Sequence, residues 1–277
     1  MLVTGKELLK EAQKNGYAVP SPDFWDSASA RVFVQVAEKL HQPVILSFAE
    51  IHKDHLSLEE AAAIGRFYAE SVSVPVALHL DHGTSLEFIK KAIDLGFTSV
   101  MIDASAKDFD ENVRITKEAV EYAHRFNIPV EAEIGHVGSE DEEGPHVISA
   151  STYTEPAMAA EFVRQTGADS IAVSIGTSHG AYKNGTPHIN FDILKEIRKA
   201  VDVPLVLHGG SGSGDENLSE CARLGICKVN IYTDYIKAAR EAAMERPYGN
   251  WLQVLDAAEK AVAEVHEHYY HVLNCVK

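Results

Sequence analysis

The sequence predicts an α/β protein built as a single (β/α)8 TIM barrel that spans residues 1–277. Short apolar runs rich in β-branched residues alternate with polar-apolar segments of helical period, which is typical of strand–helix units. The runs number eight, and eight parallel units close naturally into a barrel. No linker or change in composition divides the chain. An open doubly wound sheet is the competing architecture, but no GxGxxG motif follows the first run.

Proline or glycine marks the start of seven of the eight predicted strands. Proline opens four of them, where its missing N–H costs no ladder hydrogen bond. Glycine precedes three others and can end the previous helix in a left-handed conformation. In chain order, the strands are predicted at 17–21, 43–47, 75–79, 96–103, 129–133, 167–173, 204–208 and 225–231. Helical patterns lie between them, for example at 57–71, 85–95, 111–126, 155–166 and 192–201.

Composition and charge limit the possible partners. The formal net charge of -16 opposes binding to nucleic acid, although local N–H groups and one lysine can still bind a small phosphate. No apolar run approaches the ~20 residues that a membrane helix needs, so we expect no membrane partner. The first residues form a charged amphipathic segment that does not resemble a signal peptide. The three cysteines are scattered without CxxC spacing, which favours a reducing cytoplasm.

Polar residues gather at the ends of the predicted strands. Two long connections, 136–151 and 176–187, also follow strands, and such loops carry the active sites of barrels of this kind. In the strand 130–134, Glu131 and Glu133 share one face, opposite three apolar residues, so both should point into the barrel. Buried carboxylates need cations, hydrogen bonds or protons, and Lys228 is the predicted interior partner of Glu131.

Three histidines just beyond strand ends could converge on one cation. His82, His179 and His208 would form a His₃ set with one open position, which is a known arrangement of catalytic zinc. His79 shares the inward face with Asp81 and is predicted to support the site without binding the metal. Most of the remaining histidines lie on helices or loops and are predicted to be solvated or structural.

The chain resembles the class II fructose-bisphosphate and tagatose-bisphosphate aldolases over nearly its full length. The matching segments occur in the family's order, each at a predicted strand end or helix. They are LHLDHG (78–83), MIDASA (101–106), NVRITKEAVEYAH (112–124), VEAEIGHVGSED (130–141), IGTSHGAYK (175–183), LVLHGGSG (205–212) and KVNIYTD (228–234).

The resemblance implies a zinc-dependent aldolase that reversibly cleaves a ketose phosphate into dihydroxyacetone phosphate and an aldehyde, through a metal-stabilised enediolate. It assigns Asp81 to proton transfer at the C4 hydroxyl and Glu140 to proton transfer at the ketose-phosphate carbon. It implies a homodimer or homotetramer and a monovalent cation (Na⁺ or K⁺) near the phosphate. The implied zinc ligands are His82, His179 and His208, with Asp103 and Glu133 as positions for a second or displaced metal. The implied dihydroxyacetone-phosphate cradle is Gly180, Lys183, Gly209, Ser211, Asn230 and Thr233.

The sequence departs from the family pattern where the far end of the substrate would bind. The first strand ends Ser-Pro-Asp23 instead of an Ala-Phe-Asn type segment, and a serine is missing near Ala49. Tyr232 and Ile236 replace an aspartate and the arginine associated with the far phosphate. Fructose 1,6-bisphosphate is therefore predicted to be a poor substrate. A distal group that is uncharged or carries a carboxylate is expected instead. The candidate contacts for that group lie in the loop after the second strand: Glu50, His52, Lys53 and His55.

Two other functions fit the same barrel. A metal-dependent sugar-phosphate epimerase would leave the carbon count of its substrate unchanged. A non-catalytic carbohydrate-binding barrel would not need Asp81, Glu140 and three convergent histidines together. An amidohydrolase is disfavoured because the first predicted strand lacks its HxH motif.

Overall fold

Eight parallel strands form one sheet in the computed structural model, which describes residues 1–135, 137, 153–180, 182 and 185–276. Their order is β1-β8-β7-β6-β5-β4-β3-β2, so neighbours in sequence are neighbours in space. The strands are β1 (Val19–Pro22), β2 (Val44–Ala49), β3 (Val76–Gly83), β4 (Ser99–Ile102), β5 (Val130–Ile134), β6 (Ser170–Val173), β7 (Leu205–Leu207) and β8 (Ile226–Ile231).

The sheet curls until its two end strands meet. The N–H of Phe24, just after β1, donates to the carbonyl of Ser47 in β2 at 2.9 Å. The hydroxyl groups of Ser21 and Ser47 lie 2.6 Å apart across the same seam. These contacts leave the ring nearly closed and confirm the predicted (β/α)8 barrel.

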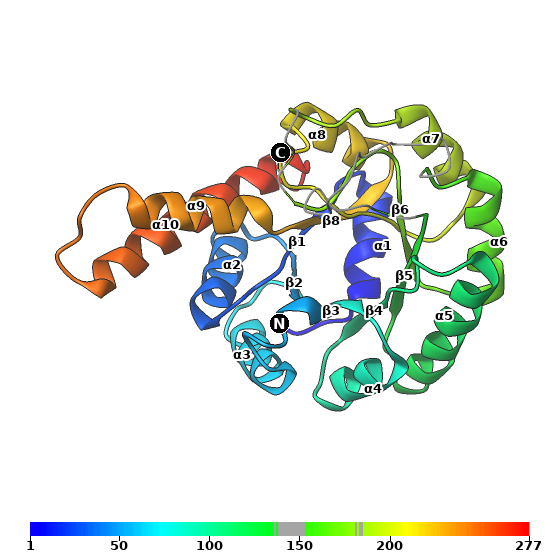
Figure 1. Ribbon diagram of the computed structural model, residues 1–277, viewed down its shortest axis with the longest axis horizontal. Coiled ribbons are helices and arrows are strands. Elements are labelled where there is room, and N and C mark those ends of the chain that lie inside the picture. The colour runs from blue at the N-terminus through cyan, green and yellow to red at the C-terminus, as the bar shows by residue number, and fades with distance from the viewer. Residues whose placement is uncertain (136, 138–152, 181, 183–184, 277) are drawn as a thin grey trace.

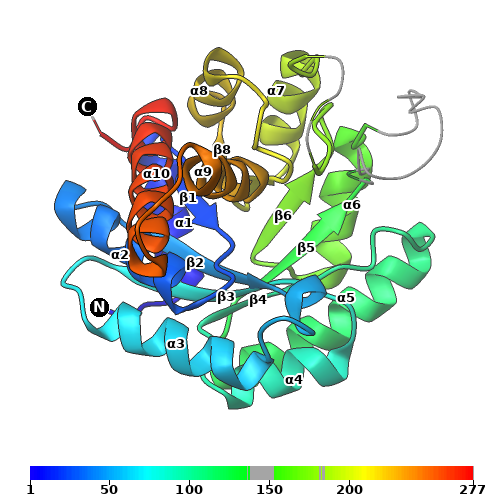
Figure 2. The ribbon, with the colours of Figure 1, turned by 60° about the vertical axis from the view of Figure 1, so that its left-hand side comes forward.

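Helices surround the strands on the outside (Figure 1), and Figure 2 shows the strands enclosed between them. Val130, Ala132 and Ile134 are buried in the apolar layer between strands and helices, as the alternation in this strand predicts. The helices are α1 (Gly5–Asn15), α2 (Ser27–Leu40), α3 (Leu58–Glu70), α4 (Leu86–Asp94), α5 (Phe109–Ala123), α6 (Pro156–Thr166), α7 (Phe191–Ala200), α8 (Asp215–Arg223), α9 (Thr233–Met244) and α10 (Trp251–Val272), with short 3-10 helices η1 (Glu50–His52) and η2 (His124–Phe126).

Helix α1 covers the amino-terminal end of the barrel. Leu8, Leu9 and Ala12 form a second apolar cluster with interior residues that include Val19 and Ala77. This plug closes one end, so the carboxyl ends of the strands at the other end remain available for a site.

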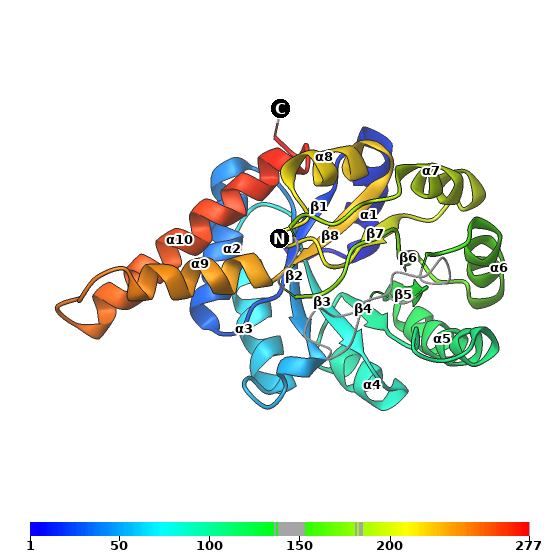
Figure 3. The same ribbon diagram turned by 45° about the horizontal axis from the view of Figure 1, so that its top comes forward.

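Helices α9 and α10 form a hairpin that projects from the barrel, as Figure 3 shows. Met244, Trp251 and Leu252 are exposed near its turn. The sequence analysis did not single out this hairpin. Among the described residues, no helix combines the length and apolar character needed to cross a membrane.

Candidate active site and metal centre

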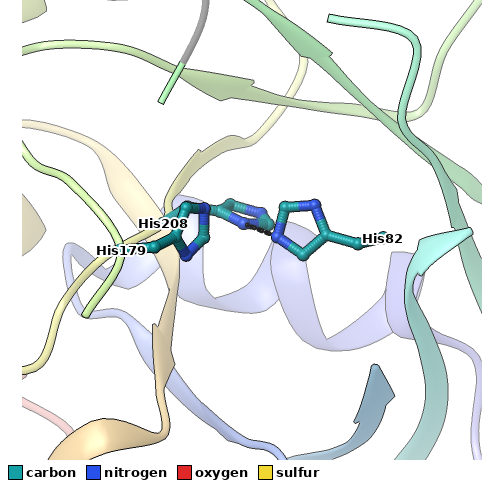
Figure 4. Close-up of side chains that lie close together, drawn as sticks. All are labelled: His82, His179 and His208. Atoms are coloured by element: carbon teal, nitrogen blue, oxygen red, sulfur yellow. Dashed lines mark hydrogen bonds between the residues drawn. The ribbon is translucent and has the colours of Figure 1, made fainter. Parts of the chain in front are cut away.

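The rings of His82, His179 and His208 lie together at the carboxyl end of the barrel. His82 is the second-last residue of β3, His208 directly follows β7, and His179 follows β6. One ring nitrogen from each lies within 4.8 Å of the others, and Figure 4 shows the three rings side by side. The backbone of His82 is left-handed, with φ at 47°, which is uncommon outside glycine. The structure thus brings together the three histidines that the sequence singled out.

Carboxylates fix the orientation of two of these rings. Asp103 Oδ2 lies 2.7 Å from His82 Nδ1, and Glu131 Oε1 lies 2.9 Å from His208 Nε2. The opposite nitrogens, His82 Nε2 and His208 Nδ1, face each other at 2.8 Å. A carboxylate on one nitrogen of a histidine commonly orients the other nitrogen toward a metal. This geometry leaves His82 Nε2 and His208 Nδ1 facing each other, in positions from which both could bind one ion.

A buried lysine holds the carboxylate behind His208. Lys228 Nζ donates to both oxygens of Glu131, at 3.0 and 2.9 Å, which confirms their predicted pairing. The same Nζ lies 3.2 Å from His79 Nε2, while His79 Nδ1 lies 2.8 Å from the Ser99 hydroxyl. His79 therefore points into the barrel, as the sequence predicted, and both of its ring nitrogens are engaged.

The donor set fits one divalent cation such as zinc. Three imidazoles leave room for a fourth ligand, and zinc favours nitrogen donors of this kind. Glu133 adds a second indication, because its Oε2 is buried without a hydrogen-bond partner among the described residues. His82, Asp103 and Glu133 also form a second group whose ligand atoms lie within 4.8 Å. The residues proposed for a displaced metal thus adjoin the histidine cluster.

The electrostatics of the cluster depend on burial and on neighbouring charges. Burial, reinforced by His82, lowers the pKa of His179 to about 3. Burial would also lower the pKa of His82, but Asp81 and the hydrogen bond that His82 donates to Asp103 outweigh it and raise the pKa to about 10. Burial, with Asp103 nearby, raises the pKa of Glu133 to about 8. The site therefore holds imidazoles and carboxyl groups close together in a buried position. A bound cation would interact favourably with both kinds of group.

Asp81 is buried beside the histidine cluster. Its Oδ1 accepts a hydrogen bond from Asn230 Nδ2 at 2.9 Å, and its Oδ2 lies 3.7 Å from His82 Nε2. Burial alone would raise the pKa of Asp81, but His82 and Lys228 outweigh it and hold the pKa below its ordinary value. Asp81 is thus a carboxylate, held by Asn230, next to the position of the predicted metal.

A cavity of about 440 Å³ opens over this cluster. Gly209 needs its left-handed backbone there (φ 68°), because a Cβ atom would lie 2.3 Å from the carbonyl oxygen of Ser178. Thr233 is the first residue of α9, so its N–H is one of the free donors at a helix start. The residues of the predicted phosphate cradle that line the cavity are Gly180, Gly209, Ser211, Asn230 and Thr233.

Two predicted site residues, Glu140 and Lys183, lie outside the described residues. Lys53 and His55 were candidate contacts for the aldehyde, but neither lines the cavity among the described residues. Lys53 instead pairs with Glu50 at 2.9 Å and lies over the ring of Phe88.

His52 does line the cavity, as does Asp23, which the sequence analysis noted only as a departure from the family. Burial, followed by the carboxylate of Asp81, holds the pKa of Asp23 well above its ordinary value. Its position just after the first predicted strand was the signal available in the sequence.

Comparison with known proteins supports the family resemblance that the sequence motifs indicate. The sequence profile of the family Fructose-bisphosphate aldolase class-II matches residues 3–277. The uncharacterized protein YdjI of Escherichia coli (strain K12) is 42% identical over 256 residues, covering 92% of this chain and 91% of that protein.

Solved structures agree with this match. The crystal structure of the YdjI aldolase from Escherichia coli K12 has a TM-score of 0.89 at 38% identity, covering 99% of this chain and 97% of that one. A Coccidioides immitis structure, provisionally assigned as a fructose-1,6-biphosphate aldolase, has a TM-score of 0.87 at 27% identity. The match covers 98% of this chain and 96% of that one. The fructose-bisphosphate aldolase of Campylobacter jejuni, at 24% identity over 99% and 96% of the chains with a TM-score of 0.80, shares the fold. The chain therefore belongs to the class II fructose-bisphosphate aldolase family.

Proposed function

We propose that this protein is a zinc-dependent class II aldolase that cleaves a ketose phosphate to dihydroxyacetone phosphate and an aldehyde, and catalyses the reverse condensation. The observation that carries the proposal is the convergence of His82, His179 and His208 beside the buried carboxylate of Asp81. A bound divalent cation would stabilise the negative charge that develops on oxygen when a C–C bond beside a carbonyl breaks.

The chain's own residues would move the protons. In the cleavage direction, Asp81 accepts the proton of the C4 hydroxyl, the C3–C4 bond breaks, and its electron pair stays on C3. Asn230 orients Asp81 through the 2.9 Å hydrogen bond. A fixed orientation is useful because a general base must lie within hydrogen-bond reach of the hydroxyl that it deprotonates. Glu140 is the proposed acid that then protonates C3, and it removes the same proton in the condensation direction.

The phosphate of the dihydroxyacetone-phosphate half is proposed to bind where backbone N–H groups approach the cavity at Gly209, Ser211 and Thr233. Lys183 and a monovalent cation are proposed to complete this cradle. The homodimer or homotetramer and the cytoplasmic location remain predictions.

Product analysis tests the proposed reaction. Incubation with dihydroxyacetone phosphate and an aldehyde should yield a ketose phosphate whose carbon count is the sum of both. Solvent deuterium should enter dihydroxyacetone phosphate without any aldehyde, and Glu140→Gln should slow this exchange about 100-fold or more, as for loss of a general base. An isomer with unchanged carbon count would instead indicate an epimerase, and ligand binding without turnover would indicate a binding protein.

A further inference from the structure

One part of the cavity wall is formed by residues that follow β1, β2 and β8. Asp23 follows β1, Ile51 and His52 belong to η1 after β2, and Tyr232 follows β8. The rings of His52 and Tyr232 pack with their centroids 4.7 Å apart. None of these residues belongs to the phosphate cradle or the histidine cluster, so this wall faces a different part of the substrate.

Unsatisfied polar atoms concentrate in the same cavity. Six buried side-chain atoms of the described residues have no hydrogen-bond partner, and four of them belong to residues that line the cavity. These four are Asp23 Oδ1, His52 Nδ1, Glu133 Oε2 and Asn230 Oδ1. A buried polar group without a partner is destabilising. A polar ligand that forms hydrogen bonds in this cavity would remove that cost.

Asp23 is the clearest case. The residue is only 6% exposed, and its side chain forms no hydrogen bond with any other described residue. Its backbone is fixed by the seam between β1 and β2, where it pairs with Ser47. The carboxyl group is therefore held at the cavity wall with its hydrogen-bonding capacity unused.

The acidic residues that line the whole cavity disfavour an anionic distal group. Asp23, Asp81, Asp103 and Glu133 line the cavity, whereas no lysine or arginine among the described residues does so. The remaining residues add two such cations in sequence, Lys277 and the cradle residue Lys183. A distal phosphate or carboxylate would thus meet a buried carboxyl group without a matching cation, which is unfavourable.

We propose that Asp23 selects the aldehyde half of the substrate, by binding a hydroxyl group of an uncharged polyhydroxy aldehyde. This inference rests on the proposed aldolase function. The carboxyl group would form the hydrogen bond that it lacks, and the chain of the aldehyde would lie against the His52–Tyr232 pair. Asp23 is then a specificity residue that acts on the half of the substrate farther from the cradle.

Three aldehydes of equal carbon number test the proposal, each condensed with dihydroxyacetone phosphate by the zinc-loaded enzyme. D-glyceraldehyde carries hydroxyl groups, propanal lacks them, and D-glyceraldehyde 3-phosphate adds a distal charge. We expect the wild type to have its highest kcat/KM with D-glyceraldehyde. Asp23→Ala should lower the D-glyceraldehyde to propanal ratio of kcat/KM about tenfold, as for one lost hydrogen bond to a buried polar group.

Asp23→Asn separates hydrogen bonding from charge. The amide still binds a hydroxyl group, so the D-glyceraldehyde to propanal ratio should stay within about threefold of the wild type. The amide can also donate a hydrogen bond to a phosphate and cannot ionise, so the kcat/KM for D-glyceraldehyde 3-phosphate relative to D-glyceraldehyde should rise about tenfold. Each ratio compares two aldehydes on one preparation, so a loss of folded enzyme cancels. Asp54→Asn, an exposed residue of the turn after η1 that does not line the cavity, should change neither ratio.

The outcomes are distinguishable. An unchanged ratio in Asp23→Ala, with normal deuterium exchange into dihydroxyacetone phosphate, would overturn the role of Asp23 and leave the aldolase function standing. A wild-type preference for D-glyceraldehyde 3-phosphate would do the same and would point to a cation from another subunit. Absence of exchange and condensation in the wild type would overturn the aldolase function and this inference together.

Discussion

Lys228 carries its ammonium group into the interior of the barrel, where only 1% of the residue is exposed. It contacts Glu131 at 2.9 Å, and Glu131 in turn contacts His208. Burial alone would raise the pKa of Glu131, but Lys228 and His208 lower it to about 2. The lysine therefore keeps Glu131 ionised behind a proposed metal ligand.

Replacing this lysine should destabilise the fold strongly. Lys228→Met leaves Glu131 buried without its cation, and breaking a buried pair costs about 3–5 kcal/mol of unfolding free energy. Urea unfolding measures the loss. Lys237→Met is the matched control, because Lys237 forms only an exposed pair with Glu241 and should change stability by less than about 0.5 kcal/mol. Similar losses in the two variants would contradict a buried, charged Lys228–Glu131 pair.

At the level of single residues, the sequence predicted correctly which way a side chain points where the alternation along a strand decides it. The inward face of Glu131 and Glu133 follows from the alternation along one strand, and both are buried. Contacts between distant strands are different. Asp103 orients His82, and the Asp23 carboxyl group has no hydrogen-bond partner among the described residues. Both facts depend on the packing of the whole ring, which the pattern within a single strand does not encode.

Helix α10 carries a fully buried histidine into the packing between α2 and α9. The ring of His266 lies 5.0 Å from that of Phe33, and the Tyr235 hydroxyl lies 2.8 Å from His266 Nδ1. Burial lowers the pKa of His266 to about 3, well below the ~6.5 of an unfolded histidine. His266 therefore stays neutral in the folded protein at pH values where the unfolded chain takes up a proton.

This difference predicts a pH-dependent contribution to stability. Between pH 6.5 and about 3 the unfolded state binds the extra proton, so the unfolding free energy falls as the pH falls. His266→Phe lacks this term. Its stability deficit relative to the wild type should thus shrink by about 2 kcal/mol between pH 7 and pH 5. Urea titrations at both pH values measure it. Tyr235→Phe keeps the histidine and should show a constant deficit, whereas a constant deficit in His266→Phe would contradict the assignment.

Element-level prediction was most reliable for the strands. Prolines before β2, β3, β5 and β7 marked their starts to within one residue, because proline is tolerated at a strand's first position. The α9–α10 hairpin was not foreseen. Its helices extend beyond the repeating strand–helix unit, and nothing in that unit's rhythm indicates that a helix pair will leave the barrel surface (Figure 1).

The whole molecule places its chemistry at one end. Helix α1 fills the amino-terminal end of the barrel, and residues from all eight strand ends or the segments that follow them line the cavity at the other. The sequence predicted this gathering because carboxyl ends of parallel strands share one rim. It did not predict which loop residues reach the cavity. His52 lines the cavity and Lys53 does not, although the two are adjacent in sequence, and strand periodicity does not apply to such a loop.

Metal removal and replacement test the central proposal, that His82, His179 and His208 hold the one zinc ion that aldol cleavage requires. Chelation should abolish cleavage of the ketose phosphate, and titration with zinc should restore it with an endpoint of one ion per chain. His208→Ala should weaken zinc binding, measured by competition with a chromogenic chelator, about 100-fold or more as for a lost ligand. Full activity in a preparation shown to be metal-free would contradict the account.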